Sequence, residues 1–150
     1  MLNLTGAHGN GKGLTDAAVP CAVADQVAKA YPQRQFVLLL HARVCAGQTA
    51  SVTAPNLRIL MHLDCDPRVA RLLHRAALVI TVEGGLAHAA LYRGCTVILI
   101  GLAHWLNETA YLYDPRRIGG KCVLAALTEG VLFDAIAGVL AGFPMADCKR

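Results

Sequence analysis

The stretch 77–101, "ALVITVEGGLAHAALYRGCTVILIG", contains one complete strand–helix–strand unit. Its first part, 77–82, is a continuous apolar run, which predicts a strand covered on both faces. A glycine pair follows and opens a predicted helix over 83–94, which Gly94 ends as the residue after the C-cap. The apolar run 95–103 predicts the next buried strand. This order is typical of a parallel sheet whose strands are joined by helices.

The same alternation continues toward both ends of the chain. The segments 43–55 and 104–120 interrupt it. The sequence of the first is consistent with either a loop or a weakly marked helix, and the second is expected to be irregular. The full predicted order, β-α-β-β-α-β-α-β-β-α, indicates one doubly wound, mostly parallel, Rossmann-like α/β domain over residues 1–150. The remaining predicted strands are 2–5, 34–42, 56–63 and 121–127, and the remaining helices are 14–31, 66–76 and 128–142.

Several residues predict where helices begin and which way they face. Asp66 is expected to cap the helix 66–76, with Pro67 as its first residue. Pro20 is expected in the first turn of its helix, because a deeper proline would break it. In the helix 128–142, helical spacing predicts five inward residues, which are Val131, Leu132, Ile136, Val139 and Leu140.

Composition narrows the class of protein. The chain is 55% hydrophobic but only 5% aromatic, which predicts an aliphatic core. The mean hydropathy of +0.46 is high, which indicates either a deeply covered sheet or an apolar surface that meets a partner, for which a homodimer is one candidate. The net charge of +4 comes from scattered residues, which argues against a nucleic-acid site and fits a small anionic ligand.

The cysteines and the N-terminus bear on the compartment. The six cysteines show no C-x-x-C spacing, which argues against a zinc site, and we expect free thiols in a reducing compartment. The sequence has neither a signal-peptide pattern nor an apolar run long enough to span a membrane. A cytoplasmic protein is therefore expected.

Two glycine-rich loops follow predicted strands. The first, "GAHGNGKG" at 6–13, lacks one feature of an ATPase P-loop, because Gly13 replaces the Ser or Thr that binds Mg²⁺. The second is "VEGGLAHAA" at 82–90. Glycines let backbone N–H groups approach a phosphate, and a helix N-terminus adds partial positive charge. The two loops together predict a diphosphate site without a metal ion.

The segment 68–101 resembles the C-terminal, donor-binding half of the ADP-heptose:lipopolysaccharide heptosyltransferase family, which are GT-B glycosyltransferases. That family's pattern is Asp-Ser/Thr-Gly-x-x-His-x-Ala between a strand and a helix, and this sequence has Glu83–Ala90 in its place. Glu83 replaces the aspartate, and Gly84 removes a hydroxyl that would contact phosphate. The resemblance covers most of 1–118.

The resemblance implies a nucleoside-diphosphate sugar as donor substrate, with no further cofactor and no metal. It implies that two loops hold the diphosphate and that residues at neighbouring strand ends face the nucleobase and sugar. The expected diphosphate residues are His8, Gly9 and Lys12 in the first loop and Gly84, Gly85, Leu86 and His88 in the second, and the expected nucleobase and sugar residues are Leu63 and Asp64. Glu83 would repel a phosphate, so we expect it to hold a sugar hydroxyl, to bond the backbone of the facing loop or to act on the substrate.

In that family an acceptor-binding half, which carries the general base, precedes the donor half. These 150 residues contain no such half, so we expect a fragment, a subunit that needs a partner chain, or a stand-alone relic. The sequence thus predicts a donor-binding domain with little or no turnover alone, and it assigns no catalytic residue. A non-catalytic interaction module is the alternative, and a P-loop NTPase is a weaker one.

Overall fold

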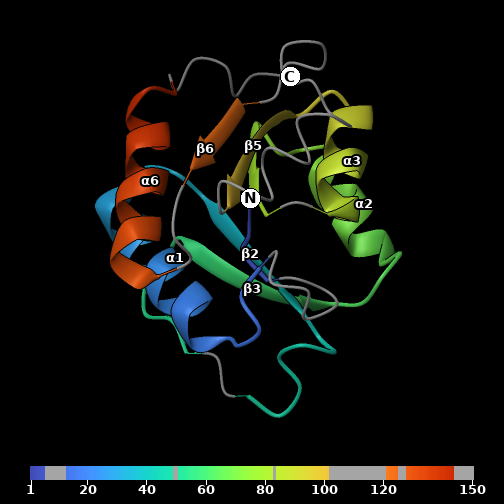
Figure 1. The fold of residues 1–150 in the computed structure, drawn as a ribbon, viewed down its shortest axis with the longest axis horizontal. Helices are drawn as coiled ribbons and strands as arrows, with labels where there is room; N and C mark the ends of the chain where they lie inside the picture. The colour runs from blue at the N-terminus through green and yellow to red at the C-terminus, as the bar shows by residue number, and fades with distance from the viewer. Residues whose placement is uncertain (6–12, 49–50, 83, 102–120, 125–127, 144–150) are drawn as a thin grey trace.

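The computed structural model describes residues 1–5, 13–48, 51–82, 84–101, 121–124 and 128–143 (Figure 1). Within these ranges the helices and strands follow the predicted order. In chain order they are β1 (Leu2–Asn3), α1 (Ala18–Ala30), β2 (Phe36–His41), β3 (Leu57–His62), α2 (Pro67–Leu73), β4 (Leu78–Thr81), α3 (Gly85–Tyr92), β5 (Thr96–Gly101), β6 (Lys121–Leu124) and α6 (Glu129–Ala141).

The strands form one six-stranded sheet in the order β3-β2-β1-β4-β5-β6, and every pair is parallel. The central strand β1 pairs Leu2 with Leu38 of β2 on one side and with Ile80 of β4 on the other. The chain first builds outward through β2 and β3 and then returns through α2 to β4. The strand order therefore reverses between β1 and β4, which confirms the doubly wound, Rossmann-like prediction.

Helices cover both faces of the sheet: α1 and α6 lie together on one face, and α2 and α3 lie on the other (Figure 1). Each face has its own cluster of buried side chains, and both are mainly aliphatic, as the composition predicts. The first includes Leu4, Val27, Leu38, Ile80 and Ile136, and the second includes Leu39, Val79, Ala87, Ala90 and Leu99.

The predicted helix signals are confirmed. Asp66 caps α2 and accepts a hydrogen bond of 2.8 Å from the backbone N–H of Arg68, and Pro67 is the first helical residue. Pro20 lies in the first turn of α1. Gly94 follows the C-cap of α3 with a φ of 73°, a left-handed conformation that glycine adopts without strain.

One inward prediction is wrong. On α6, Leu132, Ile136 and Leu140 are buried, whereas Val131 is 45% exposed. The buried residues recur every four positions, which defines a narrow stripe facing α1 and the sheet. Val131 precedes that stripe by one residue, which turns its side chain about 100° around the helix and toward solvent.

The segment 43–55, which the sequence left undecided between a loop and a helix, contains no helix in the parts that the structure describes, which are 43–48 and 51–55. Asp25 of α1 holds the end of this crossover, because its carboxylate accepts hydrogen bonds of 2.7 Å from the N–H groups of Thr53 and Ala54. The segment 104–120 lies outside the described residues, as do 125–127 of the last predicted strand. Among the described helices, none combines the length and apolar character that a membrane crossing requires.

Candidate functional site

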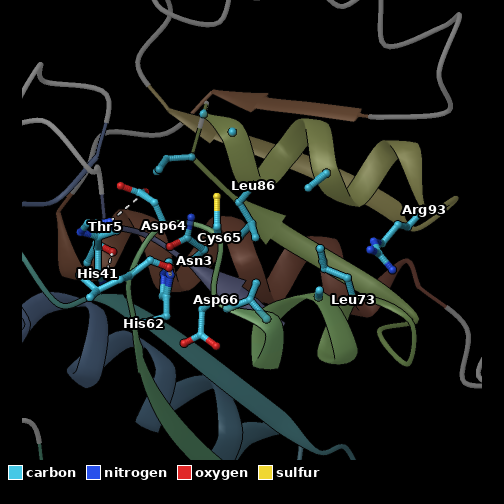
Figure 2. Close-up of a pocket in the computed structure, with 17 residues that line it drawn as sticks. Asn3, Thr5, His41, His62, Asp64, Cys65, Asp66, Leu73, Leu86 and Arg93 are labelled. Atoms are coloured by element: carbon cyan, nitrogen blue, oxygen red, sulfur yellow. Dashed lines mark hydrogen bonds and ion pairs between the residues drawn. The ribbon is translucent and has the colours of Figure 1, made fainter.

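A cavity of about 430 Å³ lies where β1, β2, β3 and β4 end (Figure 2). The turn that joins β3 to α2 forms one wall, and the turn that joins β4 to α3 forms another. This is the point at which the strand order reverses, and ligands of doubly wound sheets bind there.

The floor of the cavity is polar although the sheet face below it is apolar. On the face covered by α2 and α3, the last side chains of β1 to β4 are polar, whereas Leu39 and Val79 lower on that face are buried apolar residues. Strand register places them together, because His41 pairs with His62 and Asn3 pairs with Thr81. We call Asn3, His41 and His62, which line the cavity, the polar floor, and Thr81 is fully buried beside Asn3.

The amide of Asn3 has a fixed orientation. The hydroxyl of Thr81, which is fully buried, donates to the carbonyl oxygen of Val82 at 2.9 Å. That hydroxyl oxygen must therefore accept from Asn3, whose Nδ2 lies 3.0 Å away. Asn3 Oδ1 then points elsewhere, and this buried oxygen has no hydrogen-bond partner among the described residues.

The ring of His62 is fixed in the same way. Its Nδ1 lies 3.2 Å from the carbonyl oxygen of Leu63, and because a carbonyl only accepts, Nδ1 carries the proton. Burial lowers the pKa of His62, although the bond to Leu63 and the nearby Asp66 and Asp64 oppose that shift. The neutral ring leaves a lone pair on Nε2, and this buried atom has no partner in the described parts of the chain.

His41 is the third member of this pattern. Its side chain is only 4% exposed, and its Nε2 lies 3.2 Å from Oδ1 of Asp64. An ionised carboxylate only accepts, so Nε2 donates. In the neutral form of the ring Nδ1 is then a buried acceptor, and no described residue satisfies it. The His41 and His62 rings meet edge to face with centroids 5.3 Å apart (Figure 2).

The turn from β4 into α3 forms the opposite side of the cavity. Gly84 is the N-cap with a φ of 157° and a ψ of −176°, a conformation that is essentially restricted to glycine. As a glycine, Gly84 supplies no side-chain cap, and the first turn of α3 contains no acidic residue. Because the first N–H groups of a helix lack partners within it, those of Gly85 and Leu86 are available to an anion in the cavity.

Cys65 lies in the wall between the acidic residues Asp64 and Asp66. It has a φ of 60°, and such a left-handed conformation costs a non-glycine residue about 1–2 kcal/mol. This turn brings the chain from the end of β3 directly into the cap of α2. The two acidic side chains are both engaged, Asp64 with His41 and Asp66 with Arg68.

The structure brings together several of the residues expected from the sequence. Leu63, Asp64, Gly84, Gly85 and Leu86 all line the cavity. In contrast, His88 is exposed on α3 and does not line it. His8, Gly9, Lys12 and Glu83 lie outside the described residues, so their predicted roles stay predictions.

Sequence reasoning missed the polar floor, although the sequence contains a signal for it. Each of the four strands reads as an apolar run that ends in a polar residue, as in "LLLH" at 38–41 and "VIT" at 79–81. In a parallel sheet these ends lie side by side, so the four polar residues could have been grouped.

A second cavity of about 430 Å³ lies at the opposite, amino-terminal edge of the sheet, near Phe36 and Leu78. Among its polar lining groups, the guanidinium of Arg34 donates through Nη2 to the carbonyl oxygens of Leu140 and Phe143, whereas its buried Nε has no partner among the described residues. The described residues contain no group of three or more His, Cys, Asp or Glu side chains that could hold a metal ion. The cavity with the polar floor is therefore the better candidate site.

Comparisons with known proteins agree with this geometry at the level of the fold. No protein-family model matches the chain, and no curated protein matches its sequence. Among solved structures, the glycotransferase of kitacinnamycin aligns with 97% of this chain at a TM-score of 0.61 and 21% identity. The heptosyltransferase WaaC of E. coli, solved with ADP, aligns with 93% of it at a TM-score of 0.57 and 16% identity.

The chain spans only 35% of the length of the first structure and 42% of the second. At these identities the likeness concerns the fold. The chain has the Rossmann-like α/β fold of one half of a GT-B glycosyltransferase, as its resemblance to the heptosyltransferases predicts.

Proposed function

We propose that this chain is the donor-binding domain of a GT-B glycosyltransferase and that it holds a nucleoside-diphosphate sugar in the cavity at the switch point. The observation that carries the proposal is the uncapped start of α3, which Gly84 opens into that cavity. The N–H groups there and the partial positive charge of the helix end suit a diphosphate.

The comparisons support the same ligand class. The two structures described above are glycosyltransferases, and one of them was solved with ADP. The glycine-rich segment 6–13 also follows β1, and Lys12 within it would add a full positive charge beside the diphosphate.

In a complete enzyme this site would favour departure of the nucleoside diphosphate from the sugar. Backbone N–H groups aimed at the leaving diphosphate stabilise the charge that develops on it, and such groups need no metal ion. The acceptor would come from a second domain or a partner chain, and turnover by these 150 residues alone is expected to be low. The free thiols of Cys21, Cys45, Cys65 and Cys95 are compatible with the expected cytoplasmic setting.

Calorimetry with ADP, UDP and GDP and their sugar conjugates tests the proposal. We expect binding that Lys12→Ala weakens and that Gly85→Ala also weakens, because a methyl group at the start of α3 hinders the close approach of phosphate to the backbone. Gly138→Ala on α6 is the matched control: at both glycines an added Cβ meets no atom within 4 Å, and neither has a positive φ.

The proposal fails if no nucleotide in this panel binds to the folded chain. In that case the non-catalytic interaction module would become the better interpretation. Mg²⁺-dependent hydrolysis of ATP would instead favour the NTPase alternative.

A further inference from the structure

Three buried atoms at the ends of β1, β2 and β3 share one property. Each belongs to a side chain that a hydrogen bond already fixes, and in each case the atom left over is an acceptor. The atoms are Asn3 Oδ1, His41 Nδ1 and His62 Nε2, and none of them has a partner among the described residues. A ligand that satisfies them must supply O–H or N–H donors.

The charges around these acceptors favour a neutral ligand group over a cation. Asp64 interacts with His41 and lies 3.9 Å from the guanidinium of Arg43. Asp66 pairs with Arg68 at 2.7 Å. Because each carboxylate already faces a guanidinium, the surplus acceptors are the uncharged amide and imidazole groups, which match hydroxyl donors.

The spacing favours several hydroxyls on one ligand. The three side chains come from adjacent parallel strands, which lie about 4.8 Å apart, and the two imidazole rings are 5.3 Å apart. A single hydroxyl cannot reach acceptors that are spread over three strands, so a ligand that satisfies them needs several hydroxyls.

We propose that Asn3, His41 and His62 form a polyol subsite that binds the vicinal hydroxyls of a sugar ring through their unpaired acceptor atoms. The inference rests on the proposed function, since a nucleotide sugar carries such hydroxyls both on its ribose and on the transferred sugar. It adds the assignment of these three residues and the requirement that both imidazoles are neutral.

Protonation of an imidazole converts its acceptor into a donor. The groups that face His62 are His41 on β2 and the carboxylates Asp64 and Asp66 in the turn before α2, where Arg68 engages Asp66. Hydroxyl binding is therefore expected to weaken when the pH falls far enough for His62 to take up a proton.

Long-range ¹H–¹⁵N spectra of the histidine side chains test the subsite in the intact chain. In the free protein at neutral pH, we expect the proton on Nε2 of His41 and on Nδ1 of His62. ADP is expected to shift the two unprotonated nitrogens, and 2′,3′-dideoxy-ADP is not, if the ribose occupies the subsite. If the transferred sugar occupies it, ADP-mannose shifts them and ADP does not. A proton on Nδ1 of His41 and on Nε2 of His62 in the free protein would overturn the proposal.

A variant provides a second readout. His62→Phe keeps the ring shape but removes the acceptor, and we expect it to lower the affinity for the effective ligand roughly tenfold. Met61→Gln, at an exposed neighbouring position on β3, is the control that should keep the affinity. If His62→Phe does not fold, the nitrogen shifts of the unaltered chain still decide the question.

The outcomes separate this inference from the proposed function. If ADP and ADP-mannose bind by calorimetry but leave both nitrogens unmoved, the subsite is wrong and nucleotide binding stands. If no nucleotide binds, methyl riboside and methyl mannoside at high concentration decide: a shift of the nitrogens keeps the polyol subsite and rejects nucleotide binding. If none of these probes shifts the nitrogens, both the polyol subsite and nucleotide binding are rejected.

Discussion

At the scale of the residue, the site depends on a glycine that opens a helix and on side chains whose local hydrogen bonds leave one polar atom available to a ligand. Gly84 opens α3 through a backbone conformation that other residues avoid. Asn3, His41 and His62 each make a hydrogen bond that fixes the side chain and leaves a second polar atom without a partner among the described residues. An unsatisfied buried polar group costs about 1–3 kcal/mol, so the fold tolerates a local cost at this place.

Gly84→Ala should destabilise the chain although the added methyl group has room. No atom lies within 4 Å of its Cβ, so the cost comes from the φ of 157° and should be about 1–3 kcal/mol. The control is Gly85→Ala, which lies in the helix and should stabilise by up to about 1 kcal/mol. Urea unfolding of both variants measures the difference, and equal stabilities would contradict this explanation.

The stability of the chain should fall as the pH drops below about 6.5, in part because of His62. Burial lowers the pKa of His62 in the folded state, so the unfolded chain takes up this proton first. The contribution is fully present above the unfolded pKa of about 6.5 and is lost as the pH falls through the lowered folded pKa.

Denaturant unfolding at about pH 7.5 and about pH 5.5 measures this loss. His62→Phe should reduce the difference between the two free energies of unfolding, and Met61→Gln on the same strand should not. A difference as large in His62→Phe as in the unaltered chain would show that another group is responsible.

Only part of the site could be predicted at this scale. The glycine turn at 84–86 was found because glycines at a strand–helix junction have a specific physical role. The polar floor was not found, because a single Asn or His at the end of an apolar run has no distinctive pattern until the strands are placed side by side. Which nitrogen of His41 is unpaired depends on Asp64, 23 residues away, and local sequence patterns do not report such a contact.

At the scale of the element, the sequence predicted the order of all the described helices and strands, because apolar runs and capping residues are local signals. Helix ends were less accurate: α2 ends at Leu73 rather than at 76, and α1 begins at Ala18 rather than at 14. The crossover 43–55 stayed open because its described parts are held by distant contacts with Asp25 and not by their own periodicity.

The packing of α6 against α1 and the sheet gives a direct test of which residues face inward. Ile136 is fully buried, so Ile136→Ala should cost about 2–5 kcal/mol through lost apolar contact and a residual cavity. Val131→Ala removes a side chain that is 45% exposed and should change the stability by less than about 0.5 kcal/mol. Comparable losses in the two variants, measured by thermal and urea unfolding, would mean that α6 is rotated.

The end of α1 depends on a single buried amide. Nδ2 of Asn56 donates to the carbonyl oxygens of Ala28, Tyr31 and Arg34 at 2.8–3.1 Å, which joins the end of the helix to the start of β3. Asn56→Leu removes the donor of the Arg34 carbonyl oxygen, whereas those of Ala28 and Tyr31 still accept from the N–H groups of Tyr31 and Arg34, and the substitution should cost about 1–3 kcal/mol.

Asn56→Asp should cost more than Asn56→Leu at neutral pH, because a carboxylate would face three carbonyl oxygens. Acid should partly restore its stability, since the protonated carboxyl group again offers a donor. If Asn56→Asp were as stable as Asn56→Leu near pH 7 and showed no recovery in acid, the assigned amide contacts would be wrong.

At the scale of the whole molecule, the two ends of the sheet differ in character. The carboxyl end carries the polar floor, the uncapped start of α3 and the reversal of strand order, whereas the amino end carries a cavity in which Arg34 is already bound to backbone carbonyls. The matching glycosyltransferase structures are more than twice as long as this chain. If the proposed function is right, this chain should bind a donor by itself, and transfer should require an acceptor-binding partner.

Backbone amide chemical shifts during titration with ADP-sugar test this account most directly, because they report both binding and its place. We predict that the largest changes fall on the amides of Leu63 and Asp64 and of Gly84, Gly85 and Leu86, and that those around Phe36 and Leu78 stay in place. Changes confined to the amino-terminal end of the sheet, or none with any ADP-, UDP- or GDP-sugar, would contradict the assignment of the donor site.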